Sequence, residues 1–463
     1  MTVTSQIIAL IIFVGIFALA TLRKVHLGVI MFAGAAGVGI WLADMEMKQV
    51  VAGFPISILV LLVGVTYFFA IAQTNGTVDK IIESAISKVG DNAFVLPAVF
   101  FALTAGISAM GSPLAGLVMT PIGMPLAKKY GIDRMLMGLA IGCGLSAGGF
   151  APTSLFGIVT YGTAHSVGIP LNPLLLFAVA LGANVVLLVA AYVMFGGFKL
   201  LKTQASGESA PTIAPHFATK APLPSHPFER DGFSKRSAQI ARGGLKTLER
   251  TGTPAAVRSR MNATQLITVL CMGGLVASVI ALALFGLDPD IGVLCFAFAA
   301  VMTLVDPTTG KTAVAKIDWS TVLMVGGIIT FVGVLQTMGA VEFLGDAASQ
   351  IGSPLIAALV ICLIGGLVSA FASTTGMLAA LVPLAIPLVA SGDIAGWALI
   401  AALGVCSSIV DVSPFSTVGA TLVATVDEEE RPRINQLLTR WGMSMVVVGP
   451  IALVGALVLP TMF

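Results

Sequence analysis

Two short stretches decide the fold of this chain: GGFAPTS at residues 148–154 and DVSPFST at residues 411–417. Each interrupts a long apolar run, 134–166 in the first case and 394–426 in the second, with proline, small residues and hydroxyls. At membrane depth, backbone that leaves the helix is tolerated only where it is buried in protein or lines a polar cavity. We therefore interpret both stretches as helix breaks, with simple proline kinks as the alternative.

The composition around the breaks is that of a membrane protein. Of the 463 residues, 57% are hydrophobic and 10% are charged, whereas a soluble domain carries about 25% charged residues. Apolar runs of roughly 18–25 residues, the length that crosses a hydrocarbon core, recur along the chain. The sequence predicts an all-α polytopic membrane protein. We expect spanning helices at about 5–22, 26–43, 54–74, 172–198, 263–285, 290–305, 319–338 and 434–459. A short polar helix is expected at 77–90, a polar segment at 340–352, interrupted pairs at 93–128 and 354–390, and broken helices at 134–166 and 394–426.

The two parts of the chain repeat each other. Gln73-Thr74 matches Gln336-Thr337 at an offset of 263 residues, and Ser108 matches Ser369 at an offset of 261. The breaks themselves match at an offset of 262. Several matches in order at a nearly constant offset indicate an internal duplication. We predict a first repeat at 1–198, a linker at 199–261 and a second repeat at 262–463.

The linker orients the chain. It holds eleven Lys/Arg and four Asp/Glu, so its net charge is +7. Cytoplasmic loops carry the excess of basic residues, which places the linker inside. Its composition suits a solvated linker, with a basic helix on the anionic leaflet as the alternative, and no groove-reading element suggests nucleic-acid binding. Five crossings per half then put both termini outside, so the repeats are inverted, an architecture typical of transporters in the inner (plasma) membrane.

Each repeat also contains an interrupted apolar pair, at 94–129 and 354–390, too short for two full spans. We predict re-entrant hairpins with tips near Ser112 and Ser373, with two short kinked crossings as the alternative.

Asp411 is the one carboxylate placed well inside a predicted span, unless the helix end lies nearer and leaves it in water. Intramembrane carboxylates usually serve as cation ligands or proton carriers. The polar helix 77–90 is interpreted either as an arm beside the mobile hairpin or as a surface helix.

Tips and breaks supply the predicted site. Free N–H groups and helix N-termini favour an anion, and freed carbonyls and hydroxyls suit a small cation. The predicted substrate contacts are Ser112, Pro113, Thr153, Ser154, Ser373, Thr374, Thr375, Pro414, Ser416 and Thr417. The predicted cation contacts are Ser108, Gly111, Ser112, Pro152, Ser369, Ser373, Asp411 and Ser413. No Lys or Arg is expected at either break. The scattered cysteines lack metal-ligand spacing, so no transition metal or other cofactor is expected.

Residues 54–77 and Pro121-Ile122-Gly123-Met124 resemble the N-terminal signature of MatC-type dicarboxylate carriers, which are malonate and C4-dicarboxylate permeases; the resemblance covers about residues 1–160. More distantly, the whole chain is similar to the divalent anion:sodium symporters of the ion-transporter superfamily. That resemblance implies inverted repeats with hairpins and broken helices, an elevator mechanism and a homodimer. The family's Ser-Asn-Thr tips are here Ser112-Pro113-Leu114 and Ser373-Thr374-Thr375. The four-residue spacing of Ser108/Ser112 and Ser369/Ser373 resembles its sodium sites.

The resulting prediction is a secondary active transporter for small carboxylates, such as malonate or succinate, coupled to sodium or protons. The alternative is a sodium/proton antiporter or inorganic oxyanion transporter of the same superfold, with Asp411 as proton carrier. An enzyme is not expected: GLSAG at 144–148 fits GxSxG, but no strand precedes it and no His or Asp partner is predicted near Ser146.

Overall fold

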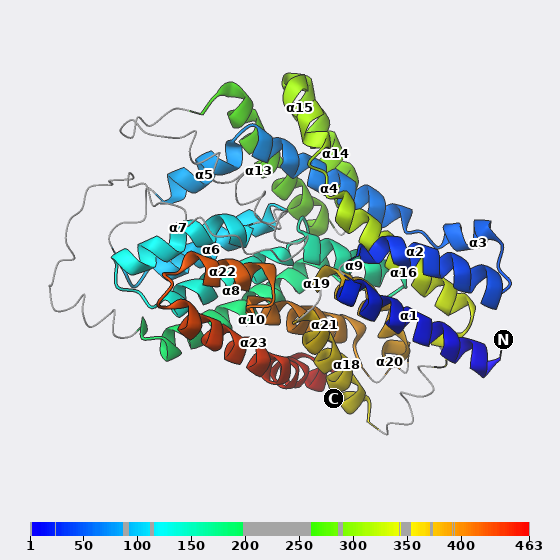
Figure 1. The fold of residues 1–463 in the computed structure, drawn as a ribbon. Coiled ribbons are helices and arrows are strands. Elements are labelled where there is room, and N and C mark those ends of the chain that lie inside the picture. The colour runs from blue at the N-terminus through cyan, green and yellow to red at the C-terminus, as the bar shows by residue number, and fades with distance from the viewer. Residues whose placement is uncertain are drawn as a thin grey trace.

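The computed structural model describes residues 2–23, 25–86, 92–111, 115–197, 261–285, 290–341, 343, 353–370, 374–390, 392 and 394–462. Within these residues the chain is helical and contains no strand (Figure 1). The all-α fold predicted from the sequence is therefore confirmed. Most of the predicted linker, 199–260, and the two hairpin tips at 112–114 and 371–373 lie outside the described residues.

The first part of the chain follows the predicted order closely. Its helices are α1 (Val3–Arg23), α2 (Leu27–Gly37) with the π-turn η1 (Val38–Leu42), α3 (Met47–Ala52), α4 (Ile56–Thr74), α5 (Thr77–Ile86), α6 (Leu96–Ala109), α7 (Ala115–Lys129), α8 (Arg134–Gly149), α9 (Leu155–Ser166) and α10 (Pro173–Met194). The predicted break at 148–154 separates α8 from α9. The six-residue α3 was not predicted, because it is too short to show an apolar period.

The second part repeats this order, except that α20 is an additional short helix and most of the segment that corresponds to α5 lies outside the described residues. Its helices are α13 (Ala263–Leu284), α14 (Ile291–Val305), α15 (Pro307–Val314), α16 (Trp319–Thr337), α18 (Pro354–Ser369), α19 (Thr374–Leu384), α20 (Ile386–Ala390), α21 (Gly396–Ile409), the 3₁₀ turn η2 (Val410–Val412), α22 (Thr417–Thr425), α23 (Arg431–Leu453), η3 (Val454–Val458) and η4 (Leu459–Met462). The unpredicted α15 occupies the place of α3, and its first turn is capped by Asp306.

Among the described residues, five helices are long and apolar enough to cross a bilayer: α1, α4, α10, α16 and the continuous run from α23 to residue 462. Shorter apolar helical stretches, of 10 to 17 residues, lie in α2 with η1, α6, α13, α14, α18, α19, and α21 with η2. Several of them are the arms of the interrupted pairs and of the broken helices, which is why each falls short of a full span. The chain is a multi-pass α-helical membrane protein.

Glycines bring the two parts together at two equivalent crossings. A Cβ on Gly28 of α2 would lie 2.1 Å from the carbonyl oxygen of Leu323 in α16. A Cβ on Gly327 of α16 would lie 2.2 Å from the Gly28 carbonyl oxygen. At the second crossing, a Cβ on Gly64 of α4 would lie 2.6 Å from the Gly292 carbonyl oxygen in α14. Positions 28 and 292 correspond at an offset of 264, and 64 and 327 at 263. The α2–α16 and α4–α14 crossings are thus equivalent positions of the internal repeat.

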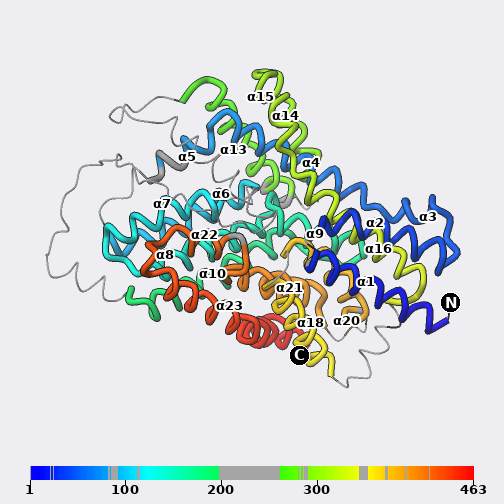
Figure 2. The backbone as a smooth tube through the Cα atoms, viewed as in Figure 1, coloured from blue at the N-terminus to red at the C-terminus, as the bar shows by residue number. Residues whose placement is uncertain are grey.

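The helices divide into two groups, each drawn from both parts of the chain (Figures 1 and 2). In the first group, α2 packs against α16 and α4 against α14. In the second, α8 packs against α6, α7 and α10, while α21 packs against α18 and α23. The second group also contains the reciprocal pairs α7–α22 and α9–α19. Contacts between the groups run mainly through α4–α9 and α16–α19.

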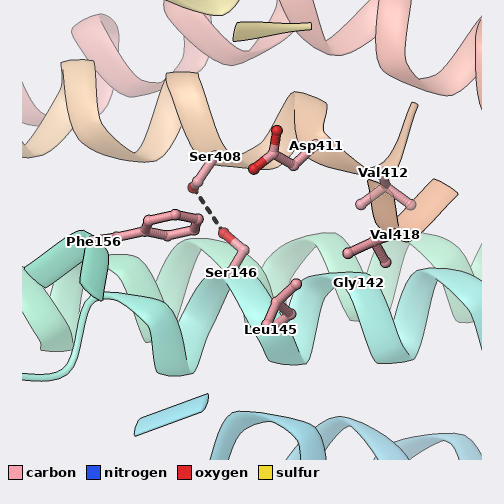
Figure 3. A pocket seen from close by; sticks show the side chains of 8 residues that line it. All are labelled: Gly142, Leu145, Ser146, Phe156, Ser408, Asp411, Val412 and Val418. Carbon is pink, nitrogen blue, oxygen red and sulfur yellow. Dashed lines mark hydrogen bonds between the residues drawn. The ribbon is translucent and has the colours of Figure 1, made fainter. Parts of the chain in front are cut away.

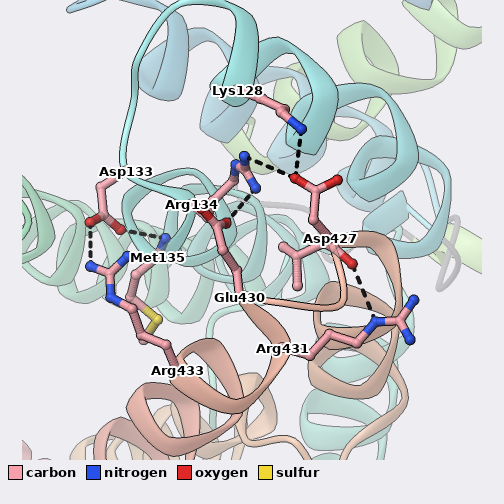
Figure 4. A network of polar contacts seen from close by, with 9 residues as sticks. Lys128, Asp133, Arg134, Met135, Asp427, Glu430, Arg431 and Arg433 are labelled. Atoms are coloured by element: carbon pink, nitrogen blue, oxygen red, sulfur yellow. Dashed lines mark hydrogen bonds and ion pairs between the residues drawn. The ribbon is translucent and has the colours of Figure 1, made fainter.

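An ion-pair cluster ties the α7–α8 connection to the α22–α23 connection (Figure 4). Arg134 donates to Glu430 at 2.5 Å and lies 3.5 Å from Asp427. Lys128 donates to Asp427 at 2.7 Å, and this hydrogen bond lowers the pKa of the Asp427 carboxyl. Beside it, Arg433 pairs with Asp133, which also caps α8. The cluster fixes the end of α22 to the start of α8.

We expect Gly327→Ala to destabilise the protein by roughly 1–3 kcal/mol, because the added methyl group would collide with backbone that has no room to move. Thermal unfolding in detergent, followed by size-exclusion fluorescence, measures the loss. Gly15→Ala is the matched control, since a Cβ there has nothing within 4 Å. Equal unfolding temperatures for the two variants would contradict the close crossing.

Arg134→Gln is expected to lower stability more than Lys128→Gln. The Arg134 side chain is 10% exposed and pairs with two carboxylates, whereas Lys128 is 63% exposed and pairs with one. Exposed pairs contribute little, while a hydrogen bond between charged groups shielded from water contributes roughly 1.5–3 kcal/mol. Because the folded pKa of Asp427 is lowered, its contribution is present above the ordinary carboxyl pKa and is lost as the pH falls. Unfolding temperatures at neutral and acidic pH test both statements, and a larger loss for Lys128→Gln would contradict the ranking.

Candidate functional site

Hydroxyl groups hold each hairpin arm against its neighbouring broken helix. Ser108, at the end of α6, donates to the carbonyl of Leu145 in α8 at 3.0 Å. Its counterpart Ser369, at the end of α18, donates to the carbonyl of Ser407 in α21 at 2.6 Å. Both predicted cation residues are thus buried and occupied as donors. The same contact recurs in both halves, 261 and 262 residues apart.

A second pair of hydrogen bonds has the opposite direction: a hydroxyl in each break donates to a carbonyl at the end of the hairpin arm. Thr153 donates to the carbonyl of Ala109 at 2.6 Å, and Ser413 donates to the carbonyl of Ala370 at 3.2 Å. These carbonyls stand at the ends of α6 and α18, where helix termini leave oxygens without an intrahelical partner. Each break and its hairpin arm are therefore joined by reciprocal hydrogen bonds and form one unit.

Glycines let the chain turn tightly at these places. Gly111 has φ +82°, a conformation that only glycine adopts without strain, and directly precedes the hairpin tip. A Cβ on Gly157 would lie 2.2 Å from the Ala151 carbonyl oxygen, and one on Gly419 would lie 1.9 Å from the Ser413 carbonyl oxygen. The helix that follows each break therefore starts directly against the backbone of the break.

Asp411 lies in the second break, in the 3₁₀ turn η2, and is partly buried. Thr374, at the start of α19, donates to its Oδ2 at 2.5 Å. The Thr374 hydroxyl is also 2.8 Å from that of Ser369. Ser416 donates to the backbone carbonyl of Asp411 and accepts from the Gly419 amide at 3.0 Å, so it caps α22. Thr374 thus contacts the carboxylate itself, Ser369 reaches it through Thr374, and Ser416 contacts the backbone of Asp411.

A small cavity lies beside Asp411 (Figure 3). About 10 Å³ is open to the centre of a water molecule, which is the space that one water needs. Ser146 and Ser408 meet across it at 2.7 Å. The lining residues are Gly142, Leu145, Ser146, Phe156, Ser408, Asp411, Val412 and Val418.

One expectation about this region is wrong. The sequence predicted no Asp near Ser146, yet Asp411 lines the same cavity. Ser146 accepts from Asn184 and bonds to Ser408, which is a packing role rather than that of a nucleophile. The sequence also predicted no Arg or Lys at either break, and neither 148–154 nor 411–417 contains one. Gly442 of α23 packs closely on Ser413, because a Cβ there would lie only 2.8 Å from the Ser413 Cβ.

The remaining predicted residues are placed as follows. Thr375 follows Thr374 in the first turn of α19 and is buried, and Ser154 precedes α9 and is buried. Pro152 and Pro414 lie in the turns of the two breaks, and Thr417 begins α22. Ser112, Pro113 and Ser373 lie outside the described residues. Within the described part of the chain, no group of three His, Cys, Asp or Glu side chains stands close enough to hold a metal ion.

Sequence reasoning missed Asn184 and the pair Ser146–Ser408. The signal was present, because positions 146 and 408 differ by 262, the offset of the breaks. Ser146 lies two residues before the first break, which begins at residue 148, and Ser408 lies three residues before the second, which begins at residue 411. A serine in an apolar helix is common, however, and only the fold shows that these two contact each other.

Residues 3–149 match a carrier family. The matching model is that of the dicarboxylate carrier protein MatC N-terminus. This confirms the resemblance seen in the sequence for that region, and the matched family is one of carriers rather than enzymes. No curated protein matches the chain significantly. Among solved structures, the YdaH transporter of Alcanivorax borkumensis is similar at 14% identity and a TM-score of 0.45, covering 90% of this chain and 88% of that one.

Thr374→Val is expected to reduce stability by roughly 1–3 kcal/mol, because it keeps the side-chain shape but removes the donor to Asp411 and the partner of Ser369. Thermal unfolding in detergent measures this loss. Thr330→Val is the control: its buried hydroxyl donates only within its own helix, to Gly326. If both variants lose the same amount, the Thr374 contact carries no special weight.

Proposed function

We propose that this protein is a secondary active carrier that imports small carboxylates, in particular dicarboxylates such as malonate or succinate, by cation-coupled symport. The observation that carries the proposal is the match of residues 3–149 to the dicarboxylate carrier protein MatC N-terminus. It is supported by two helix breaks that bring free helix ends, hydroxyls and one carboxylate into the interior of the second helix group.

The chemistry of the breaks suits a small anion together with a cation. At the second break, α19 and α22 both begin beside Asp411, and helix N-termini favour anionic groups. Thr375 and Ser416 add hydroxyls at these two starts. A carboxylate anion held there would lie close to the Asp411 carboxylate, which requires a cation or proton between the two negative charges. Substrate and coupling ion would thus depend on each other.

Energetics also require coupling. A dianion that enters a cell with a negative interior moves against the potential, at roughly 2.3 kcal/mol per charge per 100 mV. Two cations entering with it neutralise that cost, and their own inward concentration gradient then drives accumulation of the dianion. The coupling ion is sodium or a proton in this proposal.

For the transport step we propose an elevator motion of the second helix group against the first. In its support, reciprocal hydrogen bonds and the ion-pair cluster tie the second group together, while the groups touch mainly through α4–α9 and α16–α19. The proposed setting is the inner membrane, with inverted repeats at 1–198 and 262–463, both termini outside, the linker 199–261 cytoplasmic, and a homodimer as the assembly.

Reconstituted protein provides the test. We expect uptake of radiolabelled malonate or succinate into liposomes when an inward sodium or proton gradient is imposed. Thr375→Ala should raise the KM about five- to tenfold, the effect of losing roughly one hydrogen bond to the substrate. Thr330→Val should transport like the unchanged protein. If no organic anion moves under any gradient while sodium and protons exchange, the protein is an antiporter and the proposal is wrong.

A further inference from the structure

The contact between Ser146 and Ser408 marks the symmetry axis of the second helix group. The two residues are equivalent in the repeat, 262 residues apart, and their hydroxyls are 2.7 Å from each other. In a two-fold arrangement, a residue contacts its own equivalent only at the axis. The cavity beside this pair (Figure 3) therefore lies at the centre of the unit formed by both breaks.

The cavity is nevertheless asymmetric, because only one half contributes a carboxylate. The position equivalent to Asp411 is Gly149. A Cβ at Gly149 would lie 2.6 Å from the ring of Phe156, which also lines the cavity. The position equivalent to Phe156 is the smaller Val418. The Phe156 ring thus occupies the space beside Gly149, and Asp411 is the one carboxylate that lines the cavity.

This site does not suit a metal cation. Hard cations take about six or more oxygen ligands. Only Asp411, Ser146 and Ser408 offer side-chain oxygens to the cavity, and the other lining residues are apolar or glycine. The open space admits one water-sized group. A proton, in contrast, needs one carboxylate oxygen and one acceptor for its hydrogen bond.

The serines are oriented as acceptors. Ser408 donates to the carbonyl of Val405 at 3.0 Å, so its contact with Ser146 is one in which Ser146 donates. Ser146 in turn accepts from the amide of Asn184 at 3.1 Å, and Asn184 is fully buried. Both serine hydrogens are therefore used, while each oxygen keeps one free lone pair. The group that complements them from the side of Asp411 is a donor: the protonated acid or a water that it holds.

No other charge competes at the cavity. The elements packed against η2 are α8, α18, α21, α22 and α23. Their described charged residues, none of which lines the cavity, are Arg134, Arg431, Arg433 and Arg440. Their other titratable side chains are the buried thiols Cys143, Cys362 and Cys406. Asn184 adds an unpartnered buried Oδ1 at the far end of the serine chain.

We propose that Asp411, with the cavity at the Ser146–Ser408 axis, is the coupling-proton site of the carrier; this rests on the carrier function proposed above. Loading adds one proton to the carboxylate and forms the neutral acid, which hydrogen-bonds through a single water to the serine pair. Unloading returns that proton to water on the other side. No other bond changes. The neutral form removes the repulsion between Asp411 and a bound carboxylate substrate.

The test separates exchange from accumulation. In proteoliposomes with equal carboxylate on both sides, exchange of labelled substrate needs no net proton movement. Asp411→Asn, which mimics the neutral acid, is expected to keep exchange but to lose accumulation on a proton gradient and the accompanying signal of a trapped pH dye. The control is Asp44→Asn, an exposed position with φ +51° where asparagine fits equally well. Accumulation by Asp411→Asn on a proton gradient, or sodium-driven accumulation without proton movement, overturns the proposal.

A second readout does not depend on transport. Infrared spectra of the purified protein at pH 7, where ordinary carboxyls are ionised, should contain a protonated-acid carbonyl band that is missing from Asp411→Asn and present in Asp44→Asn. Absence of that difference overturns the proton site even if a carboxylate is carried. If the unchanged protein exchanges no carboxylate, the carrier function fails, and the infrared difference alone then decides the proton site.

Discussion

Every peptide group inside a bilayer must find a hydrogen-bond partner within the protein, and the structure depends on how this chain meets that requirement at its two breaks. Where α6, α8, α18 and α21 end, helix carbonyls lose their intrahelical donors. Ser108, Thr153, Ser369 and Ser413 donate to carbonyls at these places, always between a hairpin arm and its broken helix. The same hydroxyls that make the breaks tolerable thus bind the hairpins to them.

Close helix packing is the second feature that stabilises the fold. Glycines at the α2–α16 and α4–α14 crossings let backbones touch, as small residues do between membrane helices. In the second group, the hairpin arm of each half packs against the broken helix of the other half, as α7–α22 and α9–α19. One group is consequently built around backbone crossings and the other around hydrogen-bonded breaks.

The duplication is most informative where it fails. Ser146 and Ser408 keep the symmetry, whereas Asp411 and Gly149 do not. Phe156 fills the space that a side chain at Gly149 would need, so the first repeat has no room for a counterpart of Asp411. A symmetric pair of carboxylates this close together would repel each other in a medium of low dielectric constant. A single acid avoids that repulsion and gives the unit one titratable centre.

The helical class, the order of the long helices, both breaks and the place of Asp411 in the second break were predictable from the sequence, because apolar run length and interrupting prolines are local signals. The sequence did not predict α3 and α15, which are too short to carry a period, or the start of α23 at Arg431 rather than near 434. Three contacts became known only from the fold: Ser146 meets Ser408, Asp411 shares their cavity, and Gly442 packs on Ser413. Those contacts join residues far apart along the chain, and no local pattern encodes which face of one helix meets which face of another.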